Sequence, residues 1–189
     1  MKLLIFISCI FIFVSCNNIN ENNLNGYNDI NKIEGVINEI IINEQYRSKV
    51  VIINNLPLEV NNNTFLNSMD ALTIGMPIVG FYRINASNLD YYSPLMHALV
   101  ISQKSQNTNV LMNQFDRTWL YANDKFWGGN IISYQPFEDT KIIYQTGTVF
   151  NGTVDDLTNF LLLVEFDAIS LLWSDPPRAI INKIVIIDY

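Results

Sequence analysis

The chain contains a single histidine, His97, and this residue has the widest chemical range of any in the sequence. It follows Met96 directly, and Met76 lies further upstream. Imidazole and thioether groups together suit copper, so these three residues form a hypothetical soft copper site. The alternative is that the methionines fill core gaps and His97 lies at a strand edge. One histidine supports no Ser–His or Cys–His couple, and we expect no catalytic residue, no bound metal and no cofactor.

Acidic residues supply the second kind of reactive group. They occur at Glu138-Asp139, Asp155-Asp156, Glu165 with Asp167, and Asp175. A glycosidase needs two carboxylates that face each other across a cleft, and no spacing here predicts that convergence. Asp155-Asp156 is similar to an oxygen-rich calcium loop but lacks EF-hand spacing. We interpret Asp155-Asp156 as solvated turn residues and keep an envelope hydrolase or enzyme accessory domain using surface carboxylates as the alternative function.

Aromatic residues gather around one short polar turn. Trp119, Tyr121, Phe126 and Trp127 flank the segment 123–125, whose composition is typical of a hairpin turn. Rings at a hairpin tip can stack on sugars or insert into a pocket of a protein partner. Rings at such a turn also pack across the two strands. We therefore treat these four residues as candidate ligand-binding residues, with core packing as the competing interpretation.

Residues 1–16 give the most specific signal in the chain. Lys2 is followed by the apolar run 3–14 and then by Ser15 and Cys16. This run is short for a membrane span but fits the core of a signal peptide. The end of the run resembles a bacterial lipobox, with Phe13 where leucine is commonest. The resemblance implies cleavage before Cys16 and lipidation of Cys16 with palmitate-type chains, whereas an ordinary secretory signal or a buried strand would leave Cys16 unmodified.

Cysteine content and charge exclude further classes of protein. Cleavage would remove Cys9 and lipidation would use Cys16, so neither a disulfide nor a zinc–thiolate site would remain. The formal net charge is −7 without any Lys/Arg cluster, which differs from the basic surface of nucleic-acid-binding proteins. We expect a lipoprotein of the cell envelope, periplasmic or at the cell surface, that contacts the membrane and an envelope protein or glycan, and no nucleic acid.

The residues that must position these groups have the pattern of β-strands. The chain is 49% hydrophobic and rich in Val, Ile, Phe and Tyr, which favours strands. Residues 72–101 organise the first half through an apolar run at 78–82, an aromatic–proline corner at 91–94 and a second run at 98–101. Similar features recur at 160–164, 173–177 and 184–187, and 63–65 corresponds to 139–141. The apolar residues of segment 110–121 are also spaced as in a helix, but the turns that follow favour two strands.

These correspondences predict a mainly β fold built as two tandem small OB-like β-barrels of about 75 residues each, because short meanders must hide their edges. A single larger β-sandwich or barrel is the alternative. The expected division is a signal peptide at 1–15, a flexible Asn-rich tether at 16–31, one β module at 32–104 and a second at 105–189. Such a chain would act as a non-catalytic binding or structural module.

Several of these segments resemble the β-rich module of secreted clostridial proteins that often accompanies a copper amine oxidase N-terminal-like domain. The similar segments are 63–65, 74–82, and 91–94 followed by 98–101. The second half is similar to the partner module at 115–116, 123–124, 140–142 and 176–177. The chain departs from the family at 93–96, where the family has a double proline and an aromatic residue. The resemblance implies an OB-like fold and an extracytoplasmic setting, and it supplies no catalytic residue.

Overall fold

The part of the chain that the structure describes is mainly β-strand, and its strands form two sheets. The computed structural model describes residues 30–43, 48–84, 96–115, 117–121, 124–128, 133–170 and 178–187. The helical elements among them are two short 3-10 turns, η2 (Val154–Asn159) and η3 (Ala168–Ser170). Within these ranges no helix has the length and apolar content needed to cross a bilayer. The predicted mainly β class is confirmed, whereas Cys16 and both aromatic–proline corners lie outside the described residues.

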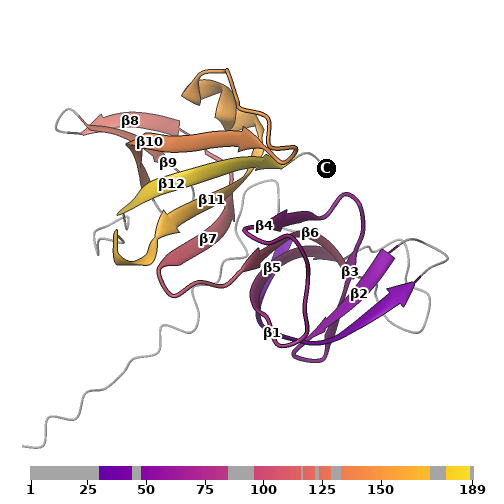
Figure 1. The fold of residues 1–189 in the computed structure, drawn as a ribbon. Coiled ribbons are helices and arrows are strands. Elements are labelled where there is room, and N and C mark those ends of the chain that lie inside the picture. The colour runs from indigo at the N-terminus through magenta and orange to yellow at the C-terminus, as the bar shows by residue number, and fades with distance from the viewer. Residues whose placement is uncertain are drawn as a thin grey trace, which may run out of the picture.

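The first sheet closes on itself. Its strands are β1 (Ile30–Asn43), β2 (Ser48–Ile53), β3 (Leu56–Val60), β4 (Phe65–Asn67), β5 (Pro77–Ile84) and β6 (Met96–Gln103), in the order β3-β2-β1-β5-β6-β4. A parallel pairing of β3 with β6, at Leu58 opposite Met96 and Glu59 opposite His97, joins the two ends of this order. The result is a ring of β1, β2, β3, β6 and β5, which appears in Figure 1 as the strongly curved indigo-to-magenta body.

Strand β1 is long because it serves two neighbours. Its first half pairs with β5, from Ile30 opposite Arg83, and its second half pairs with β2, with a bulge after Ile37. Gly35 lies just before that bend. A Cβ atom there would lie 2.7 Å from the side-chain amide nitrogen of Asn54. A larger residue at this position would have to displace the side chains of Asn54 and Ile53 in the β2–β3 hairpin.

The second sheet repeats the same connections. Its strands are β7 (Thr108–Asn113), β8 (Arg117–Tyr121), β9 (Asp124–Gly128), β10 (Ser133–Tyr144), β11 (Leu161–Asp167) and β12 (Arg178–Ile187), in the order β7-β11-β12-β10-β9-β8. Strands β7 and β8 together take the role of β1, because β7 pairs with β11 and β8 pairs with β9. Strands β10 and β12 are parallel, as β3 and β6 are. The strand pattern of residues 110–121 is thereby confirmed over the helical one.

Two local details occur at equivalent places in the two sheets. In β6 the bulge leaves Leu99 unpaired between Ala98 and Val100, and in β12 it leaves Asn182 unpaired between Ile181 and Lys183. The hydroxyl of Thr64 donates to the carbonyl of Ala98 at 2.8 Å. The hydroxyl of Thr140 donates to the carbonyl of Ile181 at 2.9 Å. The expected correspondence of residues 63–65 with 139–141 is confirmed.

The bulges also correct two expected correspondences. Counting from them, Val79 opposite Ser102 is equivalent to Leu163 opposite Val185. Residues 78–82 therefore correspond to 162–166, two residues later than the expected 160–164. Residues 98–101 correspond to 181–184, three residues earlier than the expected 184–187. The apolar run of the second half begins earlier than its equivalent, because Phe160 packs against the interior of the second sheet before β11 starts. The positions of apolar residues alone therefore do not fix how the strands of the two sheets align.

Three hydrophobic clusters hold this arrangement together. One lies inside the first ring and includes Ile37, Val51 and Leu58. Another lies inside the second sheet and includes Leu162 and Ile184. The third cluster lies between the sheets; it joins Ile30, Val79, Phe81 and Val100 of the first to Val110, Met112, Ile143, Leu161, Leu163, Val185 and Ile187 of the second. We call this third cluster the junction core; equivalent strands of the two repeats supply it, so the repeats pack through equivalent faces.

The two threonine hydroxyls give a matched test of the repeat. We expect Thr64→Val and Thr140→Val each to lower the free energy of unfolding by about 1 kcal/mol or more, because each removes the hydrogen bond to a bulge carbonyl and leaves the side-chain size unchanged. Thr64→Val also removes the bond that this hydroxyl accepts from the N–H of Asn61 at 3.1 Å. The exposed Thr73→Val is the control and should change it by less than about 0.5 kcal/mol. Urea unfolding measures all three variants. A cost at one threonine and none at the other would contradict the equivalence.

Candidate functional site

The outer surface of β1, β2 and β3 carries an apolar strip. Ile41 lies opposite Val50, and Ile52 lies opposite Pro57. Their chain neighbours Val51, Ile53 and Leu58 are fully buried inside the ring, and alternation along a strand therefore directs the strip outward. We define the β1–β3 face as Ile41, Val50, Ile52, Pro57 and Glu59.

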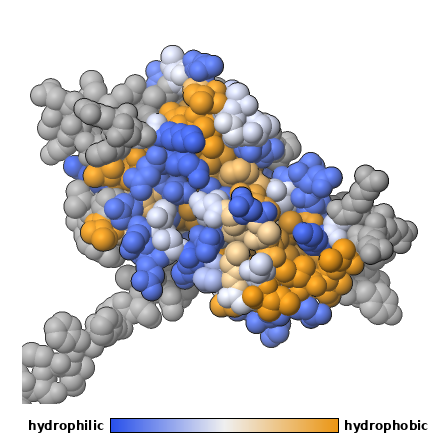
Figure 2. All heavy atoms as spheres, viewed as in Figure 1, coloured by the Kyte–Doolittle hydropathy of each residue, from blue (hydrophilic) through white to orange (hydrophobic). Residues whose placement is uncertain are grey.

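Exposure and shape make the β1–β3 face a candidate contact surface. Ile41 is 47% exposed, and the other four residues of the face are half-buried. Figure 2 shows apolar atoms gathered over the part of the molecule where Figure 1 places β1 and β2. A partly exposed apolar strip with a polar rim is typical of surfaces that bind a partner.

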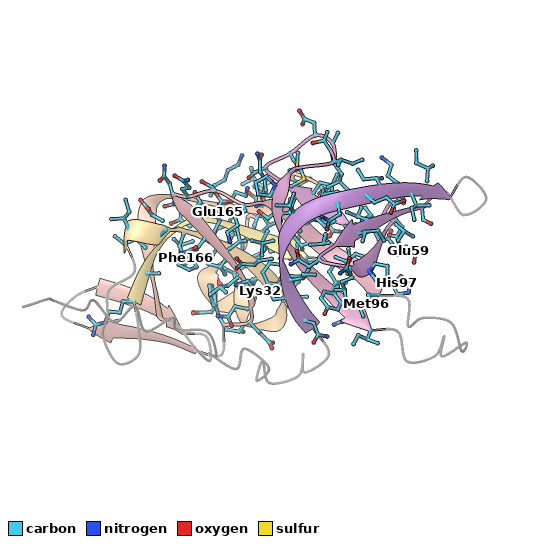
Figure 3. The ribbon with its side chains drawn as sticks, turned by 90° about the horizontal axis from the view of Figure 1, so that it is seen from below. Lys32, Glu59, Met96, His97, Glu165 and Phe166 are labelled. Carbon is cyan, nitrogen blue, oxygen red and sulfur yellow. The ribbon has the colours of Figure 1, made fainter. Side chains whose placement is uncertain are left out.

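His97 and Glu59 form a close pair at one edge of this face. Nδ1 of His97 lies 2.6 Å from Oε2 of Glu59, and both side chains are half-buried. The pair exists because β6 runs parallel to β3, with Arg83 of β5 next to His97 on its other side. A carboxylate at this distance fixes the orientation of the imidazole ring. Figure 3 shows Glu59 and His97 together on the side of the first sheet away from the second.

The three residues of the hypothetical copper site do not converge in the structure. Met96 packs toward the interior of the first ring, whereas the next residue, His97, pairs with Glu59 on the outside. Met76 precedes β5, and Met96 lies opposite Ile84 at the far end of that strand. A strand of that length separates its ends by roughly 23 Å. The interpretation of both methionines as core filling is the one that the packing favours.

The strands that carry the four aromatic candidates are described, but their side chains lie outside the described part. Trp119 is opposite Phe126, Trp127 is opposite Thr118, and Tyr121 is opposite Asp124. Counted from the bulges, Trp127 takes the register position of Val51 in the first sheet. Trp119 and Phe126 then take the positions of Ile41 and Val50. The assignment of all four residues to ligand binding stays a prediction. Trp119 and Phe126 have equivalents in the β1–β3 face, whereas the equivalent of Trp127, Val51, lies inside the first ring.

The acidic residues with described side chains have local partners. Oδ2 of Asp156 accepts hydrogen bonds from the backbone N–H and the hydroxyl of Thr153, at 2.7 and 2.8 Å. Both bonds hold the pKa of Asp156 below its ordinary value, and the bond from the hydroxyl has the larger effect. Asp167 caps the η3 turn by accepting from the N–H of Ile169. No group of three potential metal ligands occurs among the described His, Cys, Asp and Glu residues.

A polar network at the edge of the junction core escaped the sequence analysis. The side-chain amide of Asn67, which is 1% exposed, donates to Ser102 at 2.9 Å and to Glu165 at 3.2 Å. Its oxygen accepts from Nζ of Lys183 at 2.7 Å, and Lys183 lies 3.4 Å from Glu165. We call these four residues the Asn67 network. Asn67 and Ser102 belong to the first sheet and the other two to the second, so the network bridges the repeats.

The network replaces an apolar pair of the other repeat. Glu165 opposite Lys183 is equivalent to Phe81 opposite Val100, since both pairs directly follow their bulge. Phe81 and Val100 are buried in the junction core. The members of the network lie far apart in the chain, and no motif links them. Only the folded structure therefore reveals their contact.

A second charged cluster lies on the same junction. Nζ of Lys104 is 2.6 Å from one carboxylate oxygen of Glu34, and Nζ of Lys32 is 3.1 Å from the other. Partial burial acts to raise the pKa of Glu34, but the hydrogen bonds and charges of Lys104 and Lys32 outweigh it and leave this pKa below its ordinary value. Glu34 is therefore ionised at neutral pH. Figure 3 shows Lys32 between the two sheets.

Comparisons with known proteins give no information about function, so the function must be inferred from this geometry. No protein-family model, no curated protein and no solved structure matches the chain. The surfaces with an observed arrangement are the β1–β3 face with the Glu59–His97 pair, and the charged junction.

Proposed function

We propose that the protein is a lipid-anchored, extracytoplasmic binding module made of two tandem OB-type barrels. The observation that carries the fold part is the parallel pairing of β3 with β6, which closes the first ring. An OB barrel is a five-stranded Greek-key barrel, and its ligands lie on the face of its second and third strands. In the first ring those strands are β2 and β3, whose outer surface is the β1–β3 face. The second sheet has the same connections with β7 and β8 in place of one strand.

The choice of binding over hydrolysis follows from how the acidic side chains are used. Glu34 is held by two lysines, Glu59 by His97, and Glu165 by Lys183 and Asn67. Each carboxylate therefore has a structural partner of opposite charge or a hydrogen-bond donor. The β1–β3 face, by contrast, presents side chains suited to apolar contact with a polar rim. An envelope protein or a glycan is the ligand class that this face fits.

The anchoring part of the proposal rests on the N-terminal sequence. Lys2, the apolar run 3–14 and Ser15-Cys16 place a lipidated cysteine directly before an Asn-rich tract. The tract leads to β1, which begins at Ile30. Several acyl chains on one cysteine supply stable membrane attachment without a basic patch.

Photo-cross-linking in native membranes tests anchoring and binding together. A photo-cross-linking residue replaces Ile52 on the β1–β3 face or, as a control, the exposed Val149 away from that face. We expect a diacyl or triacyl mass on Cys16, and a discrete cross-linked envelope product from position 52 but not from position 149. Cys16→Ala should remove the lipid mass and release the protein from the membrane. An unmodified Cys16, or equal products from both positions, would contradict the proposal.

A further inference from the structure

The short segment between β6 and β7 lies beside a hollow in the junction. This hollow has a volume of about 380 Å³ and opens to solvent. Its lining includes four residues that carry hydroxyl groups, Ser68, Ser102, Ser105 and Thr108, together with Gln103, Lys104, Val110 and Glu165. We call it the junction hollow. A lining so rich in hydroxyl groups suits a ligand that carries many hydroxyls of its own, and the volume falls in the range of small-molecule sites.

The charges around the hollow favour a negatively charged group. Lys104 lines it with a half-exposed side chain and is paired with Glu34, which also holds Lys32. Lys183 is paired with Glu165, the acidic residue of the lining. The carboxylates among these groups are Glu34 and Glu165, so three ammonium groups stand against two carboxylates. The chain as a whole carries a net charge of −7. A local positive excess on an acidic protein is a specific feature of this junction.

The backbone at the rim of the hollow is held in an uncommon conformation. Ser68 has φ of +61°, in the left-handed region that residues with a Cβ seldom adopt. The preceding residue, Asn67, is fixed by the Asn67 network and is almost fully buried. Such conformations persist only where the surroundings over-determine them, and they are enriched at ligand sites. The network thus holds Ser68 at the edge of the hollow.

We infer that the junction hollow binds an anionic sugar, that is, a small polyhydroxylated molecule with one carboxylate or phosphate group. The ammonium group of Lys104 pairs with the oxyanion. The hydroxyls of Ser105 and Thr108 exchange hydrogen bonds with the sugar hydroxyls, and the carboxylate of Glu165 accepts hydrogen bonds from them. This site is separate from the β1–β3 face, so it stands or falls independently of the function proposed above.

Calorimetric titration of the purified full chain in detergent tests the site. The probes are glucuronate, glucose 6-phosphate, glucose and inorganic phosphate. We expect glucuronate or glucose 6-phosphate to bind about tenfold or more tightly than glucose or phosphate, because only the first two supply both the charge and the hydroxyls. The tighter of the two identifies the oxyanion as carboxylate or phosphate.

Matched variants locate the binding. Lys104→Met should weaken the preferred probe about tenfold, whereas Lys104→Arg should retain most of the affinity and Lys49→Met should leave it unchanged. Ser105→Ala with Thr108→Val, which keeps every lysine, should weaken it about threefold to tenfold. Thermal unfolding verifies that each variant is folded.

Four results would overturn the inference. They are equal affinity for glucose, equal affinity for inorganic phosphate, no binding by any probe at millimolar concentration, and unchanged affinity in both the Lys104→Met and the Ser105→Ala/Thr108→Val variants. None of these results bears on lipidation of Cys16 or on cross-linking from position 52.

Discussion

Replacing Asn67 with alanine should lower the free energy of unfolding by about 3 kcal/mol, because the change removes three hydrogen bonds of a buried side chain, two of them to charged groups. The loss leaves Lys183 and Glu165, whose side chains are about one-fifth exposed, without their shared partner. Their mutual contact at 3.4 Å is too long to compensate. Urea unfolding measured by circular dichroism gives the value.

Two comparisons make this prediction specific. Asn63→Ala removes the side chain of an exposed asparagine in the turn before β4 and should change the free energy by less than about 0.5 kcal/mol. A double-mutant cycle between Asn67→Ala and Lys183→Met should give a coupling energy of about 1 kcal/mol or more. Additive effects of the two changes would show that the bridge between the sheets does not form in solution.

Leu163→Ala should lower the free energy of unfolding by about 2–5 kcal/mol, since this side chain is completely buried in the junction core and its loss leaves a cavity. Leu162→Ala should have a similar cost. Leu162 is also completely buried but faces the interior of the second sheet. The two leucines are adjacent on β11 and point to opposite sides, which makes them a matched pair.

The difference between the two variants lies in which methyl groups respond. Leu163→Ala should shift the NMR signals of Val79 and Val100 in the first sheet, because these residues share its cluster. Leu162→Ala should instead affect Val164, Ile184 and Ile186 in the second sheet. Identical patterns of shift change in the two variants would be incompatible with a core shared between the sheets.

Much of this fold is readable from the sequence because strand periodicity and turn residues act locally. Alternating apolar residues in β3 and the Asn54-Asn55 turn before it predict a hairpin, and both asparagines adopt positive φ there. The correspondence of Thr64 with Thr140 is visible because both threonines follow a short polar segment. Local patterns of this kind require no knowledge of distant residues.

The register and the ends of the strands are harder to predict from the sequence. A shift of two residues keeps every side chain on the same face, so apolar patterning cannot distinguish residues 160–164 from 162–166. The sequence also places the start of folded structure at Lys32, whereas β1 begins at Ile30, which is buried against the second sheet. That burial depends on residues of the second sheet, which lie 80 or more positions away in the chain.

The Glu59–His97 pair and the Asn67 network are also hard to predict from the sequence. His97 stands out in the sequence as the only histidine, but its partner Glu59 is brought to it by parallel pairing of strands far apart in the chain. Asn67 is one asparagine among many in an Asn-rich sequence, and nothing nearby indicates contact with Lys183. Long-range pairing, which creates both contacts, leaves no local signature.

The central claim is that the two repeats pack through equivalent faces around one shared core. Methyl nuclear Overhauser spectroscopy on the full chain tests it directly. The structure predicts cross-peaks that join Val79 or Val100 of the first sheet to Leu163 or Val185 of the second. A spectrum in which every methyl contact of these residues stays within its own sheet would contradict the claim.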